Sequence, residues 1–133
     1  LLTGRPASTT GECVMHVRER FADDAIWDEF GAVTEAVDRA LFETPAELPA
    51  LIRQNHRLLC RIGVVPTAIQ ALIAELEAAG AGAKVCGAGS VTGDRAGVVL
   101  VTGAVDLEAF AAAHQLQTLT CTPRHRGLQL DRD

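Results

Sequence analysis

Apolar side chains recur every three to four residues through most of the first eighty positions, a pattern that predicts amphipathic helices. The first helix follows three hydroxyl residues, Ser8, Thr9 and Thr10, and runs to about Phe21. Thr9 and Glu12 have the spacing of a capping box, in which each side chain bonds the backbone of the other residue. We therefore expect this helix to begin at or next to Thr9.

Three more helices follow from the same periodicity. The third helix is expected to open at Pro45, where a missing N–H costs nothing, and to end at Gly63. The fourth runs from Pro66 or Thr67 to Gly80. The second helix follows two aspartates, and its apolar stripe is Ile26, Trp27, Phe30, Val33, Val37 and Leu41.

After residue 82 the pattern changes to short apolar runs, which are typical of strands. The expected elements are strands at 83–86 and 97–101, a helix at 106–114, a strand at 116–121, a turn at 123–127 and a short strand at 128–130. Residues 1–4 have the composition of a strand end. If the additional helices are an insertion, the order β-α-β-β-α-β predicts a ferredoxin-like α+β fold: an antiparallel sheet packed against helices, with an extra helical insertion.

Composition excludes some classes of partner. The 133 residues are 48% apolar and carry a net charge of −5, with no basic cluster longer than 124–126, so we expect no nucleic-acid partner. No apolar run approaches the length of a membrane span, so we expect a soluble, cytoplasmic protein without a membrane partner. The four cysteines form no C-x-x-C pair, and we expect free thiols, with Cys13 and Cys86 buried. His56 and Cys60 form at most half a metal site, so we expect none.

Three segments, taken together, resemble the C-terminal domain of the GHMP small-molecule kinases. Residues 84–89, Lys-Val-Cys-Gly-Ala-Gly, are similar to the third motif of that family. Residues 54–59 with 63–64 resemble the Asn-His-x-Leu-Leu…Gly-Val segment of mevalonate kinases, and residues 3–14 resemble the start of their C-terminal lobe. The chain departs from the family at Cys86, where Ser or Thr is usual, and at residues 90–97, which replace a run of glycines.

The resemblance implies that residues 1–133 are the substrate-side domain of an ATP-dependent kinase, with mevalonate as the favoured substrate. ATP and Mg²⁺ would be bound mainly by an N-terminal domain that this chain does not contain, so the fragment alone should be inactive. A chain that starts at Leu1 is also expected to be part of a longer protein, for which a homodimer is one candidate assembly. The alternative is a non-catalytic ferredoxin-like domain for small-molecule sensing or dimerisation, since this fold hosts many functions.

The resemblance places the substrate at Gly87, Ala88 and Gly89, a loop whose backbone can approach a ligand closely. Thr10 is a further substrate-binding candidate, because anions bind at helix N-termini, although a capping role is the alternative. We expect no catalytic residue in this chain. Ser90 lies in the less family-like part of the loop, where replacement by alanine is expected to have little effect.

Overall fold

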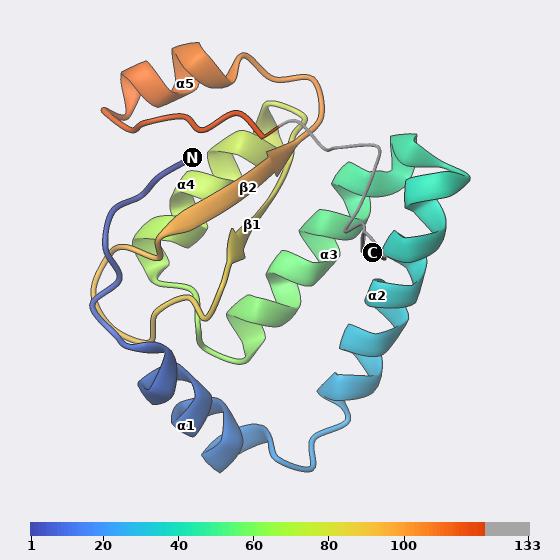
Figure 1. The fold of residues 1–133 in the computed structure, drawn as a ribbon, viewed down its shortest axis with the longest axis vertical. Helices are drawn as coiled ribbons and strands as arrows, with labels where there is room; N and C mark the ends of the chain where they lie inside the picture. Colours follow the sequence, from blue (N-terminus) through green and yellow to red (C-terminus); the bar gives the residue numbers. More distant parts are fainter. Residues whose placement is uncertain (122–133) are drawn as a thin grey trace, which may run out of the picture.

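The computed structural model describes residues 1–121 and has the expected α+β architecture (Figure 1). Its elements are α1 (Thr10–Phe21), α2 (Ile26–Phe42), a 3₁₀ turn (Pro45–Glu47), α3 (Leu48–Arg61), α4 (Thr67–Ala78), β1 (Gly82–Cys86), β2 (Val98–Thr102) and α5 (Leu107–Ala113). Each predicted helix is present, and both central strands lie within one residue of their expected bounds. The turn expected at 123–127 and the strand expected at 128–130 fall outside the described residues.

The sheet is antiparallel, as predicted. Strands β1 and β2 pair along their whole length, with Cys86 opposite Val98. On the other side of β2, Leu2 forms a bridge to Val98, and a second bridge joins Leu2 to Gln117. The order across the sheet is therefore β1, β2, the N-terminal segment and the segment around residue 117, which is the order of a ferredoxin-like sheet.

The strand expected at 116–121 is shorter than predicted, because its pairing is confined to the bridge at Gln117. The following residue turns toward the neighbouring helix instead: the Thr118 hydroxyl donates to the Glu108 carboxylate of α5 at 2.8 Å. The start of α3 also differs from the prediction. A second proline, Pro49, follows Pro45 closely, and the segment between Pro45 and Glu47 forms a 3₁₀ turn before the α-helix begins at Leu48.

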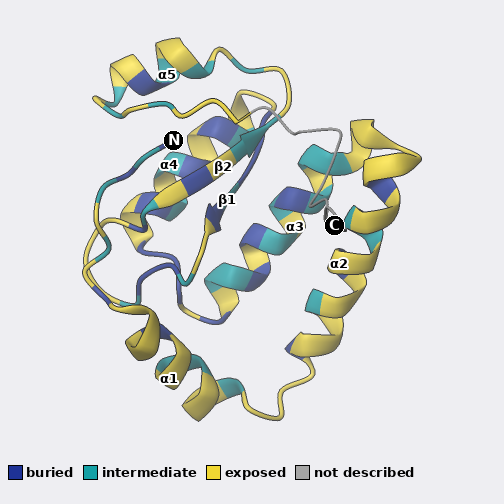
Figure 2. Cartoon of the chain, viewed as in Figure 1, coloured by how far each residue is buried: buried dark blue, intermediate teal, exposed yellow. Residues whose placement is uncertain are grey.

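Helices α2, α3 and α4 form layers on one face of the sheet. Helices α3 and α4 pack against β1, and α2 packs against the outer side of α3. Ala83, Val85 and Val99 point into this helical layer and are buried, whereas Val98 and Leu100 on the opposite face are about 40% exposed (Figure 2). Within the described residues, no helix combines the length and the apolar character that a bilayer span requires.

The apolar stripe predicted for α2 is only partly buried. Ile26 and Val33 belong to the core, but Trp27 is 41% exposed and Leu41 is 54% exposed. The Trp27 ring stacks on Phe30 at the start of α2, and its indole N–H donates to the carbonyl oxygen of Phe21 at 2.6 Å. The periodicity identified the helix correctly, but it did not show which residues of the stripe are covered.

The capping box of α1 is present as predicted. Thr9 accepts a hydrogen bond from the Glu12 N–H, and the Glu12 carboxylate accepts one from the Thr9 N–H at 2.6 Å. We expect Thr9→Ala to lower the free energy of unfolding by about 1 kcal/mol, because an N-terminal N–H of the helix loses its acceptor. Thr10→Ala, one residue further along, is the matched control and should change the stability little. Urea denaturation of both variants measures the difference, and equal midpoints would contradict the capping role.

Candidate functional site

A groove of about 540 Å³ lies where α1, the start of α2 and the end of α3 meet the loop that follows β1. Its walls are almost entirely aliphatic or aromatic, with the backbone of the glycine-containing loop on one side. The lining residues are Cys13, Val14, Val17, Arg18, Ala22, Trp27, Leu59, Ile62, Val64, Gly87 and Ala88. Such a concave apolar surface with few polar groups is typical of small-molecule sites.

The glycine-containing loop is held at one end and open at the other. Gly89 has φ +70° and lies so close to the Val64 carbonyl oxygen that a β-carbon at this position would overlap it. The next residue donates from its N–H to the same carbonyl at 2.9 Å. Gly87 has φ +83°, but open space surrounds the position of its missing β-carbon. The two glycines therefore have different roles. Gly89 allows the loop to pack directly against the Val64 carbonyl, and Gly87 exposes its backbone to the groove.

The structure brings together some of the candidate site residues and separates another. Gly87 and Ala88 line the groove, while Gly89 is buried behind them. Thr10 is exposed at the first residue of α1 and does not line the groove. The residue before it, Thr9, is the helix cap, so the structure assigns the local capping role to Thr9 rather than to Thr10.

Arg18 is the charged residue in the lining of the groove. Within residues 1–121 its guanidinium makes no ion pair, whereas Arg61 pairs with Glu29 at 2.6 Å and Arg95 approaches Asp94 at 4.0 Å. The groove thus offers one cation and no carboxylate, a set that does not fit Mg²⁺, which prefers oxygen ligands. The described part of the chain also contains no cluster of three or more His, Cys, Asp or Glu side chains able to hold a metal ion.

The cysteine prediction is correct for one residue and wrong for the other. Cys13 lies on the inner side of α1 and is 2% exposed, but Cys86 is exposed. Cys86 pairs with Val98 on the open face of the sheet, because alternation along β1 turns Val85 inward and Cys86 outward.

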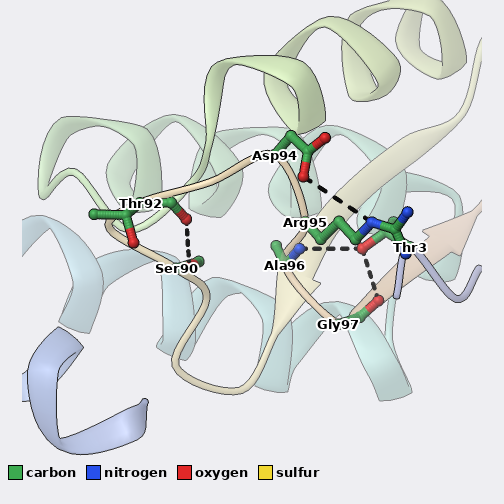
Figure 3. Close-up of polar contacts among 7 residues, drawn as sticks. All are labelled: Thr3, Ser90, Thr92, Asp94, Arg95, Ala96 and Gly97. Atoms are coloured by element: carbon green, nitrogen blue, oxygen red, sulfur yellow. Dashed lines mark hydrogen bonds and ion pairs between the residues drawn. The ribbon is translucent and has the colours of Figure 1, made fainter. Parts of the chain in front are cut away.

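Ser90, for which replacement by alanine was expected to have little effect, is buried and hydrogen-bonded. Only 1% of Ser90 is exposed, and its hydroxyl accepts a hydrogen bond from the Ser8 N–H at 3.0 Å. The same hydroxyl donates to the Thr92 carbonyl oxygen at 2.7 Å (Figure 3). Sequence reasoning missed this residue because its partner Ser8 lies 82 positions away in the chain.

Helix α3 contributes polar side chains to the interior, away from the groove. Burial lowers the pKa of His56, and the Cys60 thiol lies 3.5 Å from the His56 Nε2 atom. Burial likewise raises the pKa of the Cys60 thiol. The Asn55 Oδ1 atom is also buried, and it has no hydrogen-bond partner among the described residues.

Comparison with known proteins gives one family. The family model described as GHMP kinases C terminal matches residues 34–93, a little under half of the chain, from the middle of α2 to the glycine-containing loop. Neither the curated proteins nor the solved structures gave a match to the chain. The match supports a relation of residues 34–93 to the C-terminal domain of GHMP kinases, and these residues include the loop that lines the groove.

The two glycines of the loop should respond differently to a β-carbon. Gly89→Ala should destabilise the fold by at least about 3 kcal/mol, because the new methyl group overlaps backbone that cannot move aside cheaply. Gly87→Ala should cost only about 1–2 kcal/mol, the strain of an alanine at positive φ. Chemical denaturation of the two variants tests the difference, and a Gly89→Ala protein as stable as Gly87→Ala would show that Gly89 is not packed as described.

His56 should make stability depend on pH. Burial, followed by the nearby Arg57 charge, lowers its pKa below the usual value of about 6.5, while Glu77 opposes this shift. The unfolded chain therefore binds a proton more tightly, and stability should fall as the pH drops from about 6.5 toward the lower pKa of the folded state. Denaturation midpoints between pH 7 and pH 5 should fall less for His56→Gln than for the original chain. Parallel pH profiles would exclude His56 as the source.

Proposed function

We propose that this chain is the substrate-side, C-terminal domain of an ATP-dependent kinase that phosphorylates a small hydroxyl-bearing metabolite, with mevalonate as the favoured substrate. The domain would cover residues 1–133 and act with a separate N-terminal domain that binds ATP and Mg²⁺. We expect this enzyme to be cytoplasmic.

One observation carries the proposal: the loop inside the family match is also the loop whose backbone lines the groove. Gly87 and Ala88 leave their backbone uncovered at the groove surface, where a substrate can approach closely. Catalysis of phosphoryl transfer depends mainly on positioning and on charge stabilisation, with little covalent chemistry from the protein. A backbone-lined wall supplies positioning.

The groove also suits the chemistry of the favoured substrate. Mevalonate combines a branched aliphatic body with a carboxylate, and the groove combines aliphatic walls with the single cation Arg18. In our proposal Val14, Val17 and the loop contact the aliphatic body, while Arg18 faces the carboxylate. Gly89 supports the loop from behind, and Thr10 would contact substrate only from outside the groove.

Because the groove offers no carboxylate for a metal ion, we assign binding of Mg²⁺ and of the nucleotide to the N-terminal domain. Residues 1–133 alone should then show no kinase activity. The enzyme to be assayed is the product of the full open reading frame, with ADP release measured for mevalonate and for other small hydroxyl compounds.

A comparison of two glycines separates the effect of the loop on catalysis from the effect of backbone strain on stability. Gly87 and Gly80 both have positive φ and open space at the β-carbon, but Gly80 follows α4 and does not line the groove. Gly87→Val should lower kcat/KM by about a hundredfold, because misplacing the reacting groups by about 1 Å costs that much. Gly80→Val should lower the melting temperature to a similar degree and leave kcat/KM within about twofold.

If both variants retain the original kcat/KM, the loop does not line the substrate site. Absence of phosphorylation for every hydroxyl compound would overturn the kinase proposal and favour a sensing or dimerisation domain. Kinase activity of residues 1–133 alone would overturn the assignment of nucleotide binding to a separate domain.

A further inference from the structure

Two buried serines connect the segment before α1 to the loop after β1. Ser90 is 1% exposed and Ser8 is 9% exposed, and they are joined by a hydrogen bond between residues 82 positions apart. Ser8 lies two residues before Thr10, and Ser90 directly follows Gly89. The contact thus joins two segments that the sequence assigns to substrate binding.

The hydrogen bonds of these serines are mutually consistent. The Ser8 N–H donates to the Ser90 hydroxyl, which itself donates to the Thr92 carbonyl oxygen. In return, the Ser8 hydroxyl accepts from the N–H groups of Val91 and Thr92, each at 3.2 Å. With both acceptor positions occupied, its proton is directed to the Thr92 side-chain oxygen 2.9 Å away. We call these contacts of Ser8, Ser90, Val91 and Thr92 the serine clasp.

The clasp limits where the glycine-containing loop can lie. On one side of Ser90, its N–H and Gly89 are fixed against the Val64 carbonyl at the end of α3. On the other side, the clasp holds residues 90–92 against the segment that leads into α1. Gly87 and Ala88 make no such backbone hydrogen bond within residues 1–121, and they connect β1 to this fixed point.

We propose that Ser8 and Ser90 are positioning residues, whose hydroxyls hold the loop at Gly87 and Ala88 in register with α1 and so set the width of the groove. This inference rests on the proposed function, because the groove is taken to be the substrate site. Both walls of the groove are involved: Cys13, Val14 and Val17 belong to α1, and Gly87 and Ala88 belong to the loop.

Thr3 provides a matched control at the other end of the same loop (Figure 3). It is also buried, at 6% exposure, and its hydroxyl donates to the Gly97 carbonyl oxygen at 2.9 Å and accepts from the Ala96 N–H at 3.1 Å. Loss of the Thr3 hydroxyl leaves the Ala96 N–H without an acceptor, just as loss of the Ser90 hydroxyl does for the Ser8 N–H. Thr3 does not line the groove, so Thr3→Val should weaken the fold without moving Gly87.

The experiment compares Ser8→Ala, Ser90→Ala and Thr3→Val in the product of the full open reading frame, assayed with mevalonate below every melting temperature. We expect all three melting temperatures to fall, but kcat/KM to fall tenfold or more only for the serine variants, with KM carrying most of the loss. Ser8→Thr, which keeps the hydroxyl oxygen, should restore most of kcat/KM. Equal kcat/KM for Ser8→Ala and Thr3→Val would overturn the proposal.

Amide hydrogen exchange tests the positioning without relying on activity. The amide of residue 90 donates to the Val64 carbonyl beside Gly89, and its exchange should quicken at least tenfold in Ser90→Ala, the variant that leaves the Ser8 hydroxyl in place, and remain unchanged in Thr3→Val. If the original enzyme phosphorylates nothing, the proposed function fails, and exchange alone decides whether the clasp fixes the loop. Unchanged exchange at this amide in Ser90→Ala would overturn the clasp as a positioning device.

Discussion

The backbone pairing between residues 1–4 and residues 97–99 determines where the remaining parts of the site can lie. The Thr3 N–H donates to the Gly97 carbonyl at 2.8 Å, and the Gly97 N–H donates to the Gly4 carbonyl at 3.1 Å. These bonds place the N-terminal segment beside β2 in the antiparallel sheet. They also set the direction in which the chain leaves the sheet toward α1. Because the same pairing anchors the far end of the 90–97 loop, it brings α1 and the glycine-containing loop to the same end of the sheet. The groove lies between them.

The helices and the central strands could be predicted because their signals are local. A capping box spans three residues, an amphipathic helix repeats every three to four, and a strand alternates every two. Thr9 and Glu12 therefore located the start of α1 from sequence alone. The start of α3 was predicted at Pro45, but the α-helix begins at Leu48. Two prolines four residues apart each permit a helix to start, and only packing distinguishes them.

The candidate site was predicted only in part, because some of its contacts join residues that lie far apart in the sequence. Gly87 and Ala88 were found because their motif is contiguous, but Ser8 and Ser90 interact across 82 residues and no local pattern connects them. The burial of Cys86 was misjudged, since an apolar run in a two-layer fold does not reveal which of two alternating faces is covered. Arg18 carried no signal beyond its charge, because its position in the groove depends on how α1 packs.

The clasp and the pairing of the N-terminal segment have a consequence for folding. Contacts across 82 and 94 residues require most of the chain to be available before they can form, and closing such large loops is entropically costly. Contacts of this separation slow folding relative to local helical contacts. Helices α2, α3 and α4 can begin to form from local contacts during synthesis, whereas the groove acquires its second wall only after residues 90–99 reach the N-terminal segment. In this fold the groove is thus completed late, after the helical layer that supports it.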